Sequence, residues 1–204
     1  MTFSLIHFLD FNLLMLILFP WAKACIKKDI PTKNEFCSVF ISGFIFLFIY
    51  FFIVNSEYIK QIIKPITFKQ TFFAIIITLL CIGLDITIFF LKYKKLKIEK
   101  IQNENLFIVI LLLIVIPIQE ELIFRAFLYR LCNNYFDLSF PFILLSGVSF
   151  GLNHIIYSKI NIFTKLLWGI AFAIEFLLFQ NILLCVLSHI LCNLCIYFLG
   201  KFHK

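Results

Sequence analysis

Charged residues are scarce in this sequence. They make up 14% of its 204 residues, whereas soluble domains contain about 25%. Hydrophobic residues make up 63%, against about 45–50% in soluble domains. This composition excludes a soluble globular protein and predicts an all-α, polytopic membrane protein that exposes apolar side chains to lipid.

Arginine-rich stretches with interleaved aromatic residues are also absent. The net charge of +7 comes mainly from short lysine clusters between apolar runs, a pattern typical of membrane topology. We therefore exclude nucleic acid as a partner. The region before the first apolar run contains no lysine or arginine, and no small-residue cleavage site follows that run. We accordingly expect a retained first span rather than a cleavable signal peptide.

Metal-binding motifs are poorly represented. No H-E-x-x-H occurs, and Cys192 and Cys195 form a single C-x-x-C without a second pair. Most of the seven cysteines lie in or beside apolar runs, where cysteine is usually a small packing residue. We therefore expect no zinc or redox centre at the cysteines.

The long apolar runs predict about seven transmembrane helices, because a bilayer core of about 30 Å requires about 20 helical residues. The predicted spans are Phe3–Ala22, Phe36–Val54, Thr71–Leu91, Leu106–Leu131, Phe140–Tyr157, Phe163–Phe179 and Ile182–Gly200. Only Gln180 and Asn181 separate the last two spans, which predicts a tight helical hairpin.

Lysine distribution predicts the orientation of these spans. Thirteen lysines, including Lys165, follow the odd-numbered spans, and only Lys60, Lys64 and Lys69 lie on the opposite side. The positive-inside rule then places the N-terminus outside and the C-terminus in the cytoplasm, and we expect a bacterial cytoplasmic membrane. The hydrophilic loop 92–104 predicts a boundary between N-terminal helices, residues 1–105, and a chemical core, residues 106–204.

The first polar motif is Glu120-Glu121-Leu-Ile-Phe-Arg125, at the end of an apolar run. One charge at the bilayer centre costs about 2.5–3.5 kcal/mol, so three together indicate a function. Glu121 and Arg125 are spaced i, i+4 and can pair. Glu120 points about 100° away, and a carboxylate without a charge partner in a dry pocket suits a general base. The alternative is a buried salt bridge that only fixes helix packing.

Two further polar motifs lie on later apolar helices. Phe150 and His154 share one helix face, and so do His189 and Asn193. Each motif alone is more typical of packing between membrane helices. Together with the glutamates they predict a polar intramembrane cavity. There Glu120, beside His154, would activate a water, and Asn193 with His189 would stabilise an oxyanion.

The ordered set Glu-Glu-x-x-x-Arg, Phe-x-x-x-His and His-x-x-x-Asn resembles the CAAX protease and bacteriocin-processing family of intramembrane endopeptidases, over residues 117–193. The resemblance implies hydrolysis of peptide bonds in prenylated CAAX proteins or peptide precursors. By motif, it implies catalytic roles for Glu120, His154, His189 and Asn193, and supporting roles for Glu121, Arg125 and Phe150. Ala126 departs from the family, which often has glycine after the arginine. The sequence leaves the oligomeric state open.

Alternatives remain open at this stage. We expect no cofactor, but Glu120, His154 and His189 also form a plausible zinc set with a water as fourth ligand. The protein could instead be a non-catalytic immunity or partner-binding factor that keeps the motifs for structure. A small transporter is a third class, although the chain lacks the internal repeats that favour it.

The remaining polar residues of the spans are interpreted as structural. Asp10, Asp85 and Glu175 are single acids on three different spans. Asn153 points about 100° away from His154, which predicts a helix-packing amide. Pro117 precedes the glutamates and predicts a local disturbance of the helix.

Overall fold

The computed structural model describes residues 33–93, 109–136, 139–154 and 159–202. Within these ranges every regular element is helical, so the prediction of an all-α protein is confirmed. The elements are α2 (Lys33–Phe48), η1 (Ile49–Val54), α3 (Ser56–Ile62), α4 (Phe68–Tyr93), η2 (Leu111–Val115), α6 (Ile116–Glu121), η3 (Leu122–Phe127), α7 (Leu128–Phe136), α8 (Ser139–Asn153), α9 (Lys159–Phe179) and α10 (Ile182–Phe202), where η marks a π-helical turn. The first predicted span, residues 3–22, lies outside the described residues.

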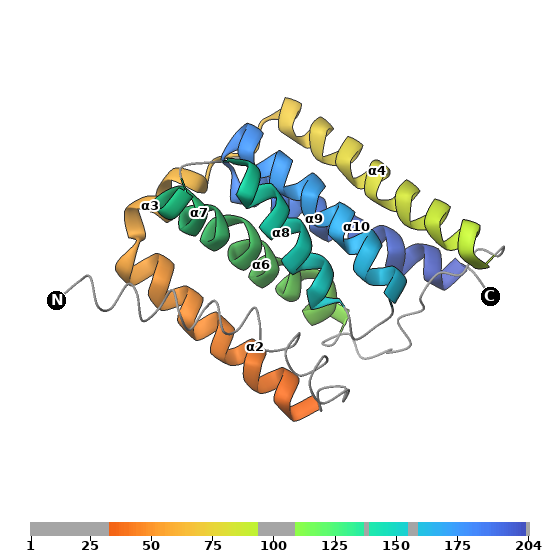
Figure 1. Cartoon of the computed structure of the whole chain (residues 1–204), viewed down its shortest axis with the longest axis horizontal. Coiled ribbons are helices and arrows are strands. Elements are labelled where there is room, and N and C mark those ends of the chain that lie inside the picture. Colours follow the sequence, from red (N-terminus) through yellow and green to blue (C-terminus); the bar gives the residue numbers. More distant parts are fainter. Residues whose placement is uncertain (1–32, 94–108, 137–138, 155–158, 203–204) are drawn as a thin grey trace.

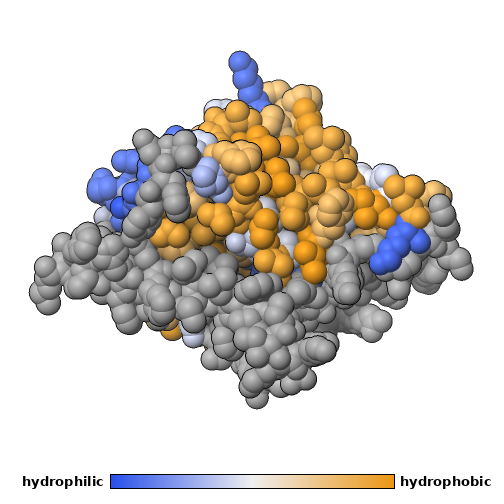
Figure 2. Space-filling view, in the orientation of Figure 1, coloured by the Kyte–Doolittle hydropathy of each residue, from blue (hydrophilic) through white to orange (hydrophobic). Residues whose placement is uncertain are grey.

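Three of the described helices are long and apolar enough to cross a membrane, namely Phe68–Lys92, Ile162–Phe179 and Ile182–Leu199. A fourth span results if Ile41–Ile53 and Ser56–Ile62 count as one segment, which bends by 94°. Figure 2 shows a broad hydrophobic surface over the middle of the molecule, with hydrophilic residues toward its ends. The protein is therefore an integral membrane protein. The count of seven spans and the orientation stay predictions.

Helix α8 is shorter than the predicted span Phe140–Tyr157. Its 15 residues rise about 22 Å, less than a bilayer core of about 30 Å. The helix ends at Asn153, and His154 is in the turn that follows. His154 is thus at a helix end, where its backbone and side chain are less constrained than inside a helix.

The predicted span with the two glutamates is one helical run from η2 to α7. Two π-helical turns flank α6, and α6 ends at Glu121. Pro117 lies in the first turn of α6, directly after η2. Because proline has no N–H, it removes one helical hydrogen bond, which agrees with a local disturbance at this point. Such π-helical turns occur frequently at functional sites.

Glycines bring α8 and α9 close together, and the two helices lie side by side in Figure 1. A Cβ atom added to Gly169 would lie 2.8 Å from the Gly147 Cα, and one added to Gly151 would lie 2.7 Å from the Ile162 carbonyl oxygen. No side chain fits in these gaps, so the glycines set the distance between the helices that carry His154 and Glu175.

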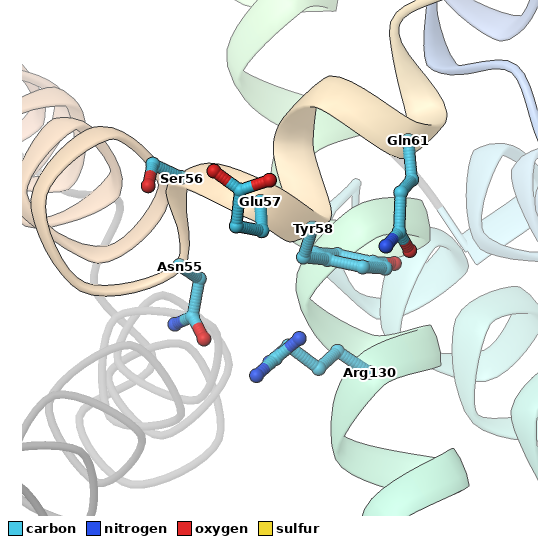
Figure 3. Close-up of a pocket in the computed structure, with 6 residues that line it drawn as sticks. All are labelled: Asn55, Ser56, Glu57, Tyr58, Gln61 and Arg130. Carbon is cyan, nitrogen blue, oxygen red and sulfur yellow. The ribbon is translucent and has the colours of Figure 1, made fainter.

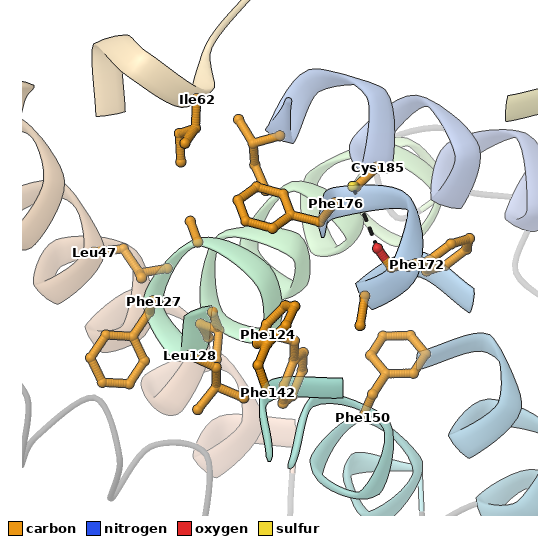
Figure 4. Packing of buried hydrophobic residues seen from close by; sticks show 14 of the residues in the cluster. Leu47, Ile62, Phe124, Phe127, Leu128, Phe142, Phe150, Phe172, Phe176 and Cys185 are labelled. Carbon is orange, nitrogen blue, oxygen red and sulfur yellow. Dashed lines mark hydrogen bonds between the residues drawn. The ribbon is translucent and has the colours of Figure 1, made fainter. Parts of the chain in front are cut away.

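A phenylalanine-rich core fills the space between η3, α8 and α9 (Figure 4). Its rings pack mostly edge-to-face, which is an arrangement that aromatic pairs prefer. Phe124 and Phe150, for example, have centroids 5.5 Å apart at 88°. The cluster surrounds the polar residues described below with apolar side chains.

The predicted hairpin between α9 and α10 is confirmed. Gln180 adopts a φ of 45°, and its N–H donates to the Phe176 carbonyl. The Asn181 side chain donates to the Lys64 carbonyl at 3.1 Å and accepts from the Leu183 N–H at 3.2 Å. These bonds satisfy backbone groups at the start of α10 and tie the hairpin to the segment before α4.

Helix α4 from the N-terminal part packs directly on α9 and α10. Lys165 Nζ lies 3.4 Å from Asp85 Oδ2, and the Trp168 ring N–H donates to the Cys81 carbonyl at 3.0 Å. Lys165 lies inside the candidate span Ile162–Phe179 and not in a loop, which removes it from the lysines used to predict the orientation. The proposed boundary at 105 falls outside the described residues, and the division into two parts stays a prediction.

Candidate active site

The two adjacent glutamates end helix α6 and point into the molecule. Glu120 is 9% exposed and Glu121 is fully buried. Consecutive residues of a helix diverge by about 100°, so the two carboxylates meet different neighbours. Their different partners give the two acids different chemistry.

Glu121 pairs with Arg125, as the i, i+4 spacing predicts. Glu121 Oε2 lies 3.0 Å from Arg125 Nε, and both side chains are fully buried. The N–H is not aligned for a hydrogen bond, so the contact is an attraction between opposite charges. Arg125 also donates from Nη2 to the Gly169 carbonyl at 3.4 Å. The pair thereby links η3 to α9.

Two aromatic rings flank the buried guanidinium. Arg125 Cζ lies 4.7 Å from the Phe150 ring centroid and 5.2 Å from that of Phe172. Aromatic faces carry negative charge density that stabilises a cation, and this matters most where water is excluded. Phe150 and Phe172 come from α8 and α9 (Figure 4), and their rings meet edge to face with centroids 6.4 Å apart at 76°. Phe172 carries no motif, so the sequence did not single it out.

His189 lies between the two glutamates. Its Nδ1 is 2.8 Å from Glu121 Oε1, and its Nε2 is 3.6 Å from Glu120 Oε2. The imidazole is 3% exposed and packs against the Phe150 and Phe172 rings, with both centroid distances at 5.5 Å. Helix α10 thus joins the glutamate helix through one side chain. The prediction that these distant motifs come together is correct for this pair.

Asn153 is the second partner of Glu120. Its Nδ2 donates to Glu120 Oε1 at 2.8 Å. The predicted helix-packing amide thus joins α8 to α6, and the group that it contacts is the Glu120 carboxylate. The helical wheel placed it away from His154, but it could not reveal that α8 turns this face toward α6. The available signal was a carboxamide in an apolar helix next to a motif histidine.

His154, in the turn after α8, contacts the backbone of the last turn of that helix. Its Nδ1 lies 2.9 Å from the Phe150 carbonyl oxygen, which can only accept, so Nδ1 carries the proton. The His154 and Phe150 ring centroids are 5.0 Å apart. Phe150 is fully buried and contacts both histidines and Arg125. The Phe150 ring thus contacts the two imidazoles and the guanidinium at once, as expected of a residue that supports the site.

Asn193 lies one helical turn beyond His189 on the same face of α10. Its side chain is half-buried, and within the described part of the chain the carboxamide makes no hydrogen bond. Its two N–H donors are available to a ligand that enters beside His189.

A comparison with known families agrees with this geometry. Residues 102–195, somewhat less than half of the chain, match the family described as "Type II CAAX prenyl endopeptidase Rce1-like". This segment belongs to the Rce1-like family. No curated protein and no solved structure matches the chain.

The match to the Rce1-like family supports, in general terms, a CAAX-type intramembrane protease. The family implies a peptide or protein substrate and a membrane environment. The matched segment contains all seven residues named from the motifs, from Glu120 to Asn193.

The same side chains can be examined as ligands of a metal ion. Among the described residues, no group of three or more His, Cys, Asp or Glu side chains is placed to hold a metal ion. In the candidate zinc set, Nδ1 of His189 is hydrogen-bonded to Glu121, and Nδ1 of His154 is hydrogen-bonded to a backbone carbonyl. The zinc set remains a hypothesis that chelation can test.

A third buried acid lies near the site. Glu175 on α9 is fully buried and accepts a hydrogen bond from Ser188 Oγ at 2.7 Å. The Ser188 carbonyl in turn accepts from Thr78 Oγ1 at 3.4 Å. Ser188 directly precedes His189, so these contacts from α9 and α4 fix the backbone that presents the histidine. The structural interpretation of Glu175 and Asp85 is consistent with these contacts.

Proposed function

We propose that the protein is an intramembrane endopeptidase in which Glu120 activates a water that attacks the substrate carbonyl. The observation that carries this proposal is the position of His189 between Glu120 and Glu121. Glu121 beside Arg125 accepts a hydrogen bond and cannot donate one while ionised. His189 therefore carries its proton on Nδ1, and Nε2 faces Glu120 as an acceptor.

Two acceptors facing each other require a donor between them. The separation of 3.6 Å between Glu120 Oε2 and His189 Nε2 is too long for a direct hydrogen bond. One water can bridge them by donating a proton to each, which leaves its lone pairs free. The water then attacks the carbonyl carbon while Glu120 takes its proton, and the C–O bond forms.

The remaining residues stabilise charge and move protons. Asn153 holds Glu120 Oε1, so Oε2 is directed to the water. Asn193 Nδ2–H donates to the oxyanion that forms on the substrate. When the C–N bond breaks, Glu120 returns its proton to the leaving amine. His154 is assigned no separate step, and its Nδ1–H is bonded to the Phe150 carbonyl.

The role of His189 in this proposal differs from the sequence-based prediction. That prediction placed His154 beside Glu120 and His189 with Asn193 on the oxyanion side. An imidazole whose Nε2 is an acceptor cannot donate to an oxyanion, so we assign His189 to water activation and leave the oxyanion to Asn193.

The test is Glu120→Gln, which keeps the size of the side chain and removes the base. We expect hydrolysis of membrane-reconstituted fluorogenic peptides to fall by about 10²–10⁴-fold, with thermal unfolding little changed. The matched control is Lys69→Gln, an exposed charge loss on α4 that should keep activity. Unchanged hydrolysis in Glu120→Gln would overturn the mechanism. No hydrolysis by the wild-type protein would favour the non-catalytic, partner-binding alternative.

The substrate panel should contain prenylated CAAX peptides and unprenylated peptide precursors. Cleavage of the first class alone would assign a CAAX substrate, and cleavage of the second alone would assign peptide maturation. The proposal uses no metal, so activity should survive exhaustive chelation. Loss of activity on chelation with rescue by zinc would instead assign Glu120, His154 and His189 as ligands.

A further inference from the structure

A polar cavity lies at the end of the molecule where α3 meets α7. It has a volume of about 270 Å³ and is lined by Asn55, Ser56, Glu57, Tyr58, Gln61 and Arg130 (Figure 3). This is smaller than the sites of about 300–1,000 Å³ that take drug-sized ligands. It suits a small polar group, and no residue of the proposed catalytic site lines it.

Arg130 gives the cavity its charge. Its Cζ lies 5.0 Å from the centroid of the Tyr58 ring, and within the described residues no carboxylate pairs with it. In Figure 3 the guanidinium extends from α7 beneath the Tyr58 ring toward Asn55. Glu57, the acid that lines the cavity, is paired with Lys60 at 2.7 Å. A planar cation without a counter-ion favours a phosphate, which it can bind through two parallel hydrogen bonds.

The wall opposite Arg130 is fixed in place. Tyr58 donates from its hydroxyl to the Ala126 carbonyl at 3.0 Å, which ties α3 to η3. Asn55 donates from Nδ2 to the Tyr50 carbonyl at 3.2 Å at the bend between η1 and α3. The cavity is thus formed by the fold itself and does not depend on a ligand to assemble it.

Its position fits the surface of a bilayer. The segment containing α3 bends by 94° from the preceding helix, so α3 lies across the end of the bundle. Ile59 and Ile62 of α3 are buried, while Glu57 and Lys60 are exposed. This pattern is typical of a helix that lies in the membrane interface.

The distance from Glu120 to Arg130 along the helix also indicates that the cavity lies at the membrane surface. Arg130 follows Glu120 by ten residues on one helical run, which corresponds to about 15 Å. That distance is about half of a bilayer core of about 30 Å, so a glutamate near the middle places Arg130 at headgroup depth. The exposed apolar side chains of Phe52 (54%) and Ile53 (66%) precede the cavity on the chain and can contact acyl chains.

We propose that this cavity binds the phosphate of an anionic phospholipid headgroup. Arg130 binds the phosphate oxygens, Tyr58 supports the guanidinium at the interface where tyrosine is enriched, and the side chains of Asn55, Ser56 and Gln61 offer further hydrogen bonds. The bound lipid would hold α3 against α7 at the membrane surface. This binding does not depend on the proteolytic mechanism.

The experiment measures lipid retention by the full chain with native mass spectrometry in detergent. Phosphatidylglycerol and phosphatidylcholine are titrated separately into wild type, Arg130→Gln and Lys64→Gln. We expect wild type to prefer phosphatidylglycerol, and Arg130→Gln to weaken that binding by about tenfold or more, because a charge-assisted hydrogen bond is removed. Lys64→Gln, an exposed charge loss near the same end but outside the cavity, should bind as wild type does.

Three results would overturn the proposal. Equal weakening in Arg130→Gln and Lys64→Gln would show attraction by net charge alone. Equal retention of both lipids by wild type would show no recognition of the anionic headgroup. Binding of inorganic phosphate without retention of phosphatidylglycerol would assign a soluble ligand. Asn55→Ala serves as a second variant if Arg130→Gln unfolds, and it should weaken lipid binding with charge unchanged.

Discussion

His189 Nδ1 lies 2.8 Å from Glu121 Oε1, so one buried glutamate holds both the histidine of α10 and Arg125 of its own helical run. This contact joins segments 68 residues apart in the sequence. It also determines which nitrogen of His189 is left for Glu120. The second glutamate of the motif is therefore the centre of the polar cluster, and Glu120 is at its edge.

Glu121→Gln tests this central position. The amide keeps an oxygen for His189 but leaves Arg125 buried without an opposite charge, which typically costs about 3–5 kcal/mol. We expect a large loss of stability in thermal unfolding of the detergent-solubilised protein. Lys60→Gln breaks an exposed ion pair and is the control, for which we expect little change. Similar unfolding of the two variants would show that Glu121 does not stabilise the core.

Asn153→Ala tests the orientation of Glu120. The substitution removes one hydrogen bond to a carboxylate, worth about 1.5–3 kcal/mol, so we expect kcat to fall about 10–100-fold. The free energy of unfolding should fall by no more than this amount, since Asn153 is half-buried at a helix end. Leu152→Ala on the same turn is the control. An equal decrease in kcat for both variants would attribute the effect to packing of the helix end.

Gly169→Ala tests the close approach of α8 and α9. The new methyl group would lie 2.8 Å from the Gly147 Cα and 2.9 Å from the Phe150 Cβ, so the helices must separate. Overpacking of this kind costs about 1–3 kcal/mol, which thermal unfolding would detect. Gly83→Ala meets nothing within 4 Å and should be neutral or stabilising. Equal unfolding temperatures would contradict the tight interface.

Glu175 and Ser188 provide a double-mutant cycle. Glu175→Leu and Ser188→Ala each remove the 2.7 Å hydrogen bond that precedes His189, so their effects on unfolding should not add. We expect a coupling of about 0.5–2 kcal/mol, as for hydrogen bonds between membrane helices. Glu175→Gln keeps an acceptor and should preserve both the coupling and kcat. Additive effects would show that the bond does not position His189.

Much of the site could be predicted because charged and hydrogen-bonding side chains are rare in the apolar runs of this chain. Glu121 and Arg125 are four residues apart, and helical geometry alone predicts their pairing. The bond from Asn153 to Glu120 and the position of Phe172 could not be predicted, for a different reason. Which face of α8 meets α6 depends on the glycine contacts with α9, and no spacing along one helix contains that information.

Local patterns in the sequence are enough to predict the helices, the hairpin at Gln180 and Asn181, and the polar residues that interrupt the apolar runs. These follow from local rules, because hydrogen bonds within a helix and the periodicity of side chains involve near neighbours. The position of His189 between the glutamates and the bond from Asn153 to Glu120 become visible only once the helices are packed together. Such contacts depend on how the helices rotate and cross, and that is set by the close packing of side chains from several helices at once.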